Sequence, residues 1–281
     1  CASCHRAHDI RKANDPKSST YAFNLPGTCA ACHANNVYMA GYDIATDQHT
    51  DYERSVHGIA LLEKRDIGAP ACNDCHGNHG AVPPEVGSID KVCGLCHANN
   101  MTNFDQSTHN EYFDALEMPA CETCHSNHYV DSPSTDMLDG ETSVCAQCHN
   151  SDESPEGLEA ADGMRKSIDS LNTSLTVVKE KLDESDRKGL FVTNALFTWQ
   201  EARQKEFAAK TAVHTFDLGK VTGVTAEGLE LASQADVAAD DLLAGYVFRR
   251  AGLAVSVFFL GLLALLLWLK ARQIDARQQS L

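Results

Sequence analysis

The chain has 281 residues, a formal net charge of −16 with histidine neutral, 12 cysteines and 13 histidines. This length allows one large domain or two small ones. The 39 Asp and Glu residues against 23 Lys and Arg argue against nucleic-acid binding, which needs a cationic face. Aromatic residues make up only 7%, which is thin for a chain that must pack a core from side chains alone.

The cysteines follow one pattern without exception. Each belongs to a C-x-x-C pair, and a histidine directly follows the second cysteine of every pair. We number these six motifs in chain order: Cys1–His5, Cys29–His33, Cys72–His76, Cys93–His97, Cys121–His125 and Cys145–His149. The predicted cofactor-binding cysteines are Cys1, Cys4, Cys29, Cys32, Cys72, Cys75, Cys93, Cys96, Cys121, Cys124, Cys145 and Cys148.

The spacing points to covalent haem c. Two thiols two residues apart on one helical turn can form thioethers with the two vinyl groups of a porphyrin, and the adjacent histidine becomes the proximal iron ligand. Zinc ribbons, iron–sulfur clusters and redox dithiols also use C-x-x-C pairs, but none of them requires the histidine. The sequence therefore predicts six covalently bound haems c. The predicted proximal ligands are His5, His33, His76, His97, His125 and His149.

The other histidines are placed by an internal repeat. Three lie three residues after a motif histidine, and two occupy matching Ser-x-His sequences that are 52 residues apart (57 and 109). We interpret them as distal iron ligands. Alternatives for the sixth distal ligand are His214, His49 and a residue before Cys1, and we favour His214. The predicted distal set is His8, His57, His79, His109, His128 and His214.

The repeat divides residues 1–150 into three modules of two haems, each expected to pair its own histidines. The Ser-x-His element of the first module would lie before residue 1, so we expect further sequence there and a cleaved export signal. We expect a mainly α, loop-rich domain of short helices with almost no sheet, in which the porphyrins replace an aromatic core. A polar linker at 150–155 ends it.

Residues 151–248 are predicted to form a helical neck. Apolar residues recur at steps of three and four along 158–182, a second helix covers 195–216, and Thr225 is the expected N-cap of a third. Residues 249–281 form the predicted anchor. Its span, 251–269, contains no charge and is about 28 Å long as a helix, close to the thickness of the bilayer core.

Three features together resemble a known family. They are S-V-H-G at 55–58, C-x-x-C-H-G-x-H at 72–79, and C-x-x-C-H-A-N at 29–35 and 93–99. The haem half is similar to the membrane-associated multihaem c-type cytochromes of respiratory chains. The resemblance implies bis-histidine, low-spin haems that pass electrons between a membrane-linked donor and another redox protein. The chain differs from the small tetrahaem quinol dehydrogenases, which carry an N-terminal anchor.

The predicted function is therefore electron transport by a single-pass protein of the inner membrane. The haem domain is expected on the periplasmic side and the C-terminus in the cytoplasm. Expected partners are an integral membrane redox subunit and an extracytoplasmic donor or acceptor, without catalysis by this chain alone. The alternative is a reductase of nitrite, hydroxylamine or a sulfur oxyanion, which would need one haem with an open distal position.

Overall fold

The structure is a computed structural model that describes residues 1–79, 87–150, 152 and 154–278. The chain divides into two compact units, of which the first comprises 1–166 and 210–220, and the second 167–209 and 221–281. The predicted boundary at 150 thus lies inside the first unit, and the stretch around His214 belongs with the cysteine motifs. Residues 151, 153 and 279–281, in the predicted linker and tail, lie outside the described residues.

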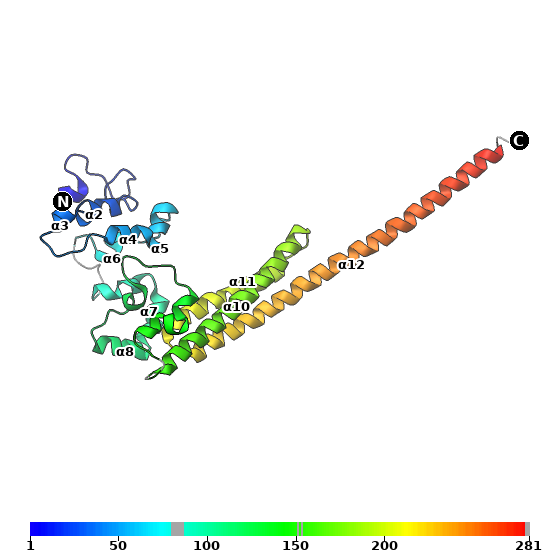
Figure 1. Ribbon diagram of the computed structural model, residues 1–281. Coiled ribbons are helices and arrows are strands. Elements are labelled where there is room, and N and C mark those ends of the chain that lie inside the picture. Colours follow the sequence, from blue (N-terminus) through cyan, green and yellow to red (C-terminus); the bar gives the residue numbers. More distant parts are fainter. Residues whose placement is uncertain (80–86, 151, 153, 279–281) are drawn as a thin grey trace. The chain divides into compact units, whose positions relative to one another are not determined.

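The first unit contains only helices and loops in the part that the structure describes (Figure 1). The expectation of a mainly helical fold with short helices is met. In chain order its elements are α1 (Ala2–His5), α2 (Leu25–His33), α3 (Asn36–Met39), α4 (Gln48–Arg54), α5 (Val56–Gly58), η1 (Ile59–Glu63), α6 (Cys72–His76), η2 (Ile89–Leu95), α7 (Ala98–Asp105), α8 (Thr108–Ala115), α9 (Glu122–His125), η3 (Thr135–Leu138), η4 (Gly140–Thr142), η5 (Val144–Gln147) and η6 (Val213–Thr215).

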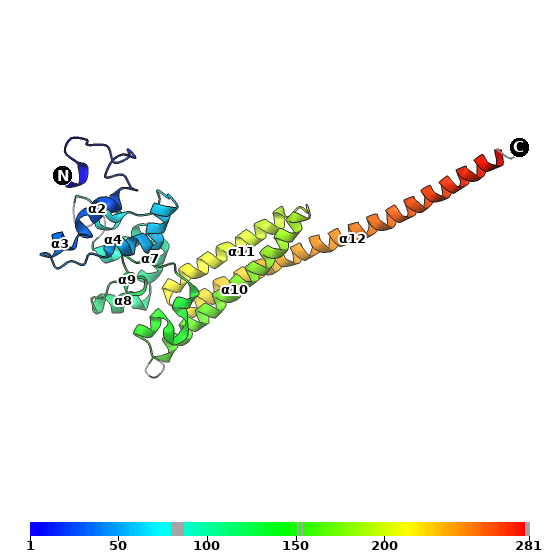
Figure 2. The ribbon, with the colours of Figure 1, turned by 45° about the horizontal axis from the view of Figure 1, so that its top comes forward.

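The second unit is built on α10 (Pro155–Arg187), α11 (Thr193–Ala212) and α12 (Leu218–Gln278), which lie side by side in both views (Figures 1 and 2). The predicted apolar stripe of α10 is buried, and Trp199 of α11 donates its indole N–H to the carbonyl of Leu175 at 2.8 Å. Alanines of α12 close the core, because small side chains let a third helix approach closely. The core residues are Leu171, Leu175, Val178, Leu182, Ala195, Trp199, Ala202, Ala232, Ala235 and Ala239.

The predicted start of the third helix is wrong. Helix α12 begins at Leu218, and Thr225, the expected N-cap, is buried inside the helix with its hydroxyl bonded to the Thr222 carbonyl. The Asp217 side chain instead accepts a hydrogen bond from the backbone N–H of Lys220 at 3.2 Å, which is the capping interaction. Because Asp217 satisfies a free N–H of the first turn, Gly219 and Gly223 do not end the helix.

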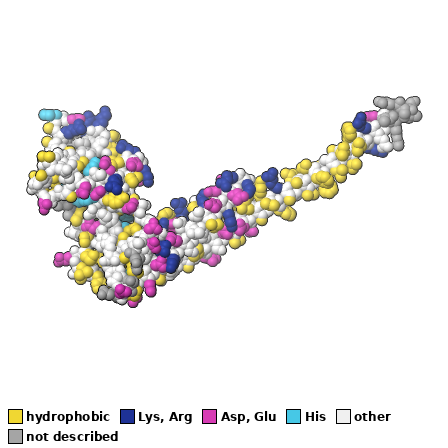
Figure 3. Space-filling view, viewed as in Figure 1, with side chains coloured by type: hydrophobic (Ala, Val, Ile, Leu, Met, Phe, Trp, Pro, Cys, Tyr) yellow, Lys and Arg dark blue, Asp and Glu magenta, His cyan; other side chains and the backbone are white. Residues whose placement is uncertain are grey.

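The C-terminal half of α12 is long and apolar enough to cross a membrane. No residue of its most apolar window is buried, and on the face shown in Figure 3 hydrophobic side chains cover this stretch of the helix. A guanidinium lies against an aromatic ring at each end of this stretch, Arg250 on Tyr246 and Arg272 on Trp268. The two rings are 22 residues apart, or about 33 Å along a helix, so they match the two interfaces of a bilayer.

Candidate metal centres

Five of the six motif histidines each face one histidine from outside the motifs. We call these contacts the imidazole pairs, and no pair joins two histidines of the same kind. The distances between ring centroids are 6.1 Å for His5–His79, 6.3 Å for His57–His97, 5.8 Å for His76–His128, 6.0 Å for His109–His149 and 6.0 Å for His125–His214.

These distances fit an iron atom between the two rings. A metal-bound imidazole nitrogen lies about 2.0–2.1 Å from the metal, which places the centroids of two axial imidazoles about 6.4 Å apart. His109 and His149 each have a buried Nδ1 without a hydrogen-bond partner within the described residues, so no hydrogen bond there fixes either ring. At five of the motifs the centroid distances are therefore ones that two imidazoles bound to a single iron would have.

The pairs do not follow the modules as predicted. His57 and His109 do face the second motif histidine of their own module, His97 and His149. The histidines three residues after a motif, in contrast, face the module before: His79 reaches His5 and His128 reaches His76. The second and third modules therefore each bring one histidine to a motif of the module before, contrary to the expectation that each module pairs its own histidines.

The same backbone turn directs His79 and His128 away from the motifs that precede them in the chain. Gly77 and Ser126, which follow the third and fifth motifs, have φ of 71° and 62° with ψ near 180°. Each donates its backbone N–H to a carbonyl four residues back, at 2.8 Å. The positive φ ends the helix and turns the chain away from its own motif, so the imidazole three residues on lies against the histidine of another motif.

The turn at Ser126 predicts a stabilising substitution. Positive φ with extended ψ is a region that glycine adopts readily and other residues only at a cost. Ser126→Gly should therefore raise the free energy of unfolding by about 1 kcal/mol in denaturant titrations of the holoprotein. Ser126→Ala is the control, because it keeps the Cβ and should change stability by less than about 0.5 kcal/mol. Equal changes in the free energy of unfolding for the two substitutions would show that the backbone at Ser126 is not strained.

The Ser-x-His histidines are placed by a second repeated feature. Ser55 and Ser107 are buried, and each donates its hydroxyl to the carbonyl three residues back, Tyr52 or Phe104, at 2.7 Å. Both serines have extended backbone between two helices, α4–α5 and α7–α8. The serine therefore breaks one helix and starts the next, which carries the histidine in its first turn.

His214 is positioned by the segment that joins α11 to α12. Its Nδ1 lies 3.1 Å from the Thr211 carbonyl, which fixes one edge of the ring, and the ring centroid lies 6.0 Å from that of His125. The Asn103 side chain of α7 donates to the same carbonyl at 3.0 Å and so ties this segment to the motif-bearing helices. Phe216, with φ of 52°, ends η6 and stacks on His109 with a centroid distance of 3.8 Å.

Burial prepares the imidazoles for metal binding. Desolvation lowers the pKa values of five of them, and the charge of a nearby histidine lowers them further. The neutral form, which has a free lone pair, is therefore favoured at neutral pH. The histidines with lowered pKa are His57, His109, His125, His128 and His214.

The cysteine thiols show which motifs are neighbours. A hydrogen bond from the Cys72 thiol lowers the pKa of Cys29 to about 7, so the second and third motifs touch. Burial, followed by the nearby charge of Cys93, raises the pKa of Cys75 to about 11, so the third motif lies beside the fourth. Burial and the charge of Cys145 likewise raise the pKa of Cys124 to about 11, which makes the fifth motif a neighbour of the sixth.

The fourth and fifth motifs are also neighbours, because the charge of His97 contributes to the lowered pKa of His125. Sites two to six therefore form one continuous series. Site one joins it at the third motif, because His79, which faces His5, lies three residues after His76. No predicted site residue lies outside this unit.

Three histidines fall outside the imidazole pairs. His8, a predicted distal ligand, and His33, a predicted proximal ligand, make no ring contact within the described residues. His49, one of the alternatives for the sixth distal ligand, lies 3.7 Å from the carboxylate of Glu53 and faces no motif histidine. A cavity of about 550 Å³ lies between the first two motifs, with Arg6 and Lys17 on its lining as cations that could receive haem propionates.

C-x-x-C pairs also serve other chemistries. Zinc ribbons and iron–sulfur clusters need about four convergent ligands. Within the described residues, no three side chains of the types His, Cys, Asp and Glu converge on one point, and none of the cysteines there is joined in a disulfide. Comparison with models of protein families, with curated proteins and with solved structures finds no match to this chain.

Proposed function

We propose that this chain is a membrane-anchored electron-transfer protein that binds six haems c. The observation that carries the proposal is the set of imidazole pairs. In each pair the ring of a C-x-x-C-H histidine lies near a second imidazole, at a centroid distance that leaves room for one iron atom between them. The cysteines would hold the porphyrins covalently, and the paired imidazoles would occupy both axial positions. Bound haem supplies reversible one-electron chemistry.

The residues around the irons favour electron transfer over substrate chemistry. Imidazoles on both faces exclude other ligands from the iron at five motifs, and an unchanged ligand set keeps reorganisation small when an electron arrives. Cys72 hydrogen-bonds Cys29, and the charges of Cys93 and Cys145 act on Cys75 and Cys124, so successive motifs lie near one another. Electrons could therefore pass along the series from site to site without a diffusing carrier.

The apolar half of α12 supports an anchor in the inner membrane. Its rings at Tyr246 and Trp268 would lie at the two interfaces, each beside an arginine. Attachment of haem to C-x-x-C-H implies an exported domain, so the haem-bearing unit would lie in the periplasm and the C-terminus in the cytoplasm. The span would also pack against an integral redox subunit of a respiratory complex.

The charge balance favours a particular kind of soluble partner. The chain carries −16 before any haem is added, and each propionate would add to this. A donor or acceptor with a basic docking face would be attracted over several ångströms, and the association would weaken with salt.

Reoxidation kinetics test the proposal. The chain produced with haem c maturation should contain six haems, and a Cys121→Ser/Cys124→Ser variant five. Reduced holoprotein should be reoxidised rapidly by ferricyanide, an outer-sphere acceptor, while nitrite, hydroxylamine and sulfite should not be consumed. Absence of covalent haem, or slow reoxidation of most of the haems by ferricyanide, would refute the proposal.

The reductase alternative rests on one observation, that His33 faces no second imidazole within the described residues. An iron bound there could keep an open position for substrate. Steady consumption of nitrite, hydroxylamine or sulfite that is lost in a Cys29→Ser/Cys32→Ser variant would establish this alternative.

A further inference from the structure

We propose that His8 and His33 form a junction to a further haem c module: His8 binds the iron of a haem held by that module, and a histidine of that module binds the iron at His33. This inference rests on the proposed function. It makes His8 a ligand of a haem held outside residues 1–281, and it makes one end of the series of sites a connection.

The backbone at His8 matches that of the two histidines that leave their motifs. Arg6 has φ of 64° and ψ of 170°, as Gly77 and Ser126 have after the third and fifth motifs. Its N–H donates to the carbonyl four residues back at 2.9 Å, again as in the other two. A strained conformation at a non-glycine residue indicates a constraint, and here it is the one that directs an imidazole away from its own motif.

The pairing order then fixes what His8 would face. His79 follows the third motif and faces the first, and His128 follows the fifth motif and faces the third. In both cases the histidine faces the motif two places earlier in the series. By the same rule, His8, which follows the first motif, would face a motif of an adjoining module. At the other end of the series the fifth motif is completed by His214, which comes from the segment after α11. One end of the series is therefore completed by His214, and at the other end His8 makes no ring contact within the described residues.

His33 would receive a ligand from the adjoining module, whereas His8 would supply one to it. It belongs to a second motif of a module, and the equivalent histidines His97 and His149 each receive a Ser-x-His imidazole. Both Ser-x-His histidines within the described residues, His57 and His109, are already paired. The iron of the adjoining module would thus bind His8, and a histidine of that module would bind the iron at His33. Both irons at the junction would then be six-coordinate.

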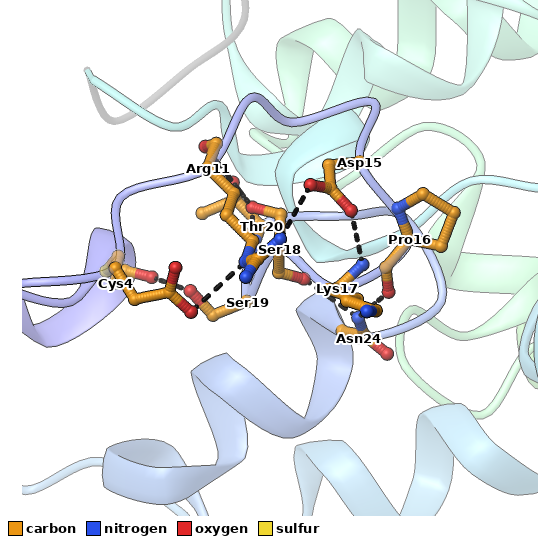
Figure 4. Close-up of polar contacts among 10 residues, drawn as sticks. Cys4, Arg11, Asp15, Pro16, Lys17, Ser18, Ser19, Thr20 and Asn24 are labelled. Carbon is orange, nitrogen blue, oxygen red and sulfur yellow. Dashed lines mark hydrogen bonds and ion pairs between the residues drawn. The ribbon is translucent and has the colours of Figure 1, made fainter.

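The segment that carries His8 is held in place from both sides (Figure 4). The Ser19 hydroxyl donates to the Cys4 carbonyl, and Thr28 donates to the Ser19 carbonyl at 2.7 Å, which links α1 to α2. Arg11 forms an ion pair with Asp15 at 3.1 Å. His8 and His33 are both exposed. A supported loop between two fixed helices presents an imidazole at lower entropic cost than a free terminus does.

The partner is defined by this chemistry as a protein segment with C-x-x-C-H-bound haem whose iron has a vacant distal position. The first test counts open irons in the holoprotein of residues 1–281 by titration of the reduced protein with carbon monoxide. We expect one carbon monoxide per chain, at His33, and the same number in His8→Ala. His79→Ala and His128→Ala should each bind one more, because these imidazoles serve irons of this chain.

The second test uses a synthetic C-x-x-C-H haem peptide as the probe for His8, with conversion of the peptide iron to low spin as the readout. Wild type should bind the peptide about tenfold more tightly than His8→Ala. His49→Ala is the matched control for an imidazole outside the imidazole pairs and should behave as wild type.

Three results would overturn the junction. They are an extra carbon monoxide bound by His8→Ala, no carbon monoxide bound by wild type, and equal peptide affinity in His8→Ala and wild type. Each of these leaves the six haems in place, whereas failure of the proposed function itself would appear as a chain without covalent haem.

Discussion

Replacement of His214 by alanine is expected to open the iron at His125 and to leave the other sites unchanged. His214 is the imidazole that faces His125, at 6.0 Å between centroids, and it comes from a part of the chain far from the motifs. The variant should bind one more carbon monoxide per chain than wild type, and one low-spin ferric signal should become high spin. His214→Met should restore a six-coordinate iron with a higher reduction potential, because a thioether replaces an imidazole.

His49→Ala is the control for this experiment. His49 was the competing candidate for the sixth distal ligand, and its ring lies beside Glu53 without facing a motif histidine. We expect its spectra and carbon monoxide binding to equal those of wild type. An open iron in His49→Ala, with none gained in His214→Ala, would contradict the arrangement described for this segment.

The second large effect is expected at Gly58, directly after His57. A Cβ at this position would overlap the Tyr52 carbonyl oxygen and lie 2.7 Å from the Tyr52 carbonyl carbon and 3.0 Å from the Glu53 Cα. These are backbone atoms of α4, and the Tyr52 hydroxyl is itself bonded to the Pro70 carbonyl at 2.8 Å, so α4 cannot easily give way. Gly58→Ala should lower the free energy of unfolding by about 2–3 kcal/mol and displace His57 from His97.

The matched control for Gly58 lies in the second repeat. Asn110 follows His109 as Gly58 follows His57, and it already carries a Cβ within α8. Asn110→Ala should therefore change the free energy of unfolding by less than about 0.5 kcal/mol in the same denaturant titration. A cost at Asn110 similar to that at Gly58 would show that the close approach to α4 is not the cause.

Local features of this fold could be predicted from sequence because they depend on neighbouring residues. The apolar stripe of α10 repeats at helical spacing, and every predicted position from Leu158 to Leu182 is buried. The predicted N-cap of the third helix, Thr225, lies eight residues after the observed one, Asp217, because Gly219 and Gly223 were interpreted as a helix end. The signal was present in the sequence, since aspartate before an apolar turn is a strong N-cap.

The partners of the histidines depend on contacts that local sequence does not encode. The spacing of His79 and His128 from their motifs is the same whether they pair within their own module or with the module before. The positive φ at Gly77 and Ser126 directs them to the module before. A serine at such a position gives no sequence signal. His214 was named as a candidate by counting ligands, but its place opposite His125 depends on how residues 210–220 join the first unit.

The way in which the modules complete one another has a consequence for biogenesis. A protein exported from its N-terminus would present His5 well before His79, and His125 well before His214. Ligation would then lag behind haem attachment along the chain, and the last site would close only after α11 had been translocated and folded. Distant residues joined through iron also act as cross-links, so the unit should mature and unfold as a whole and not repeat by repeat.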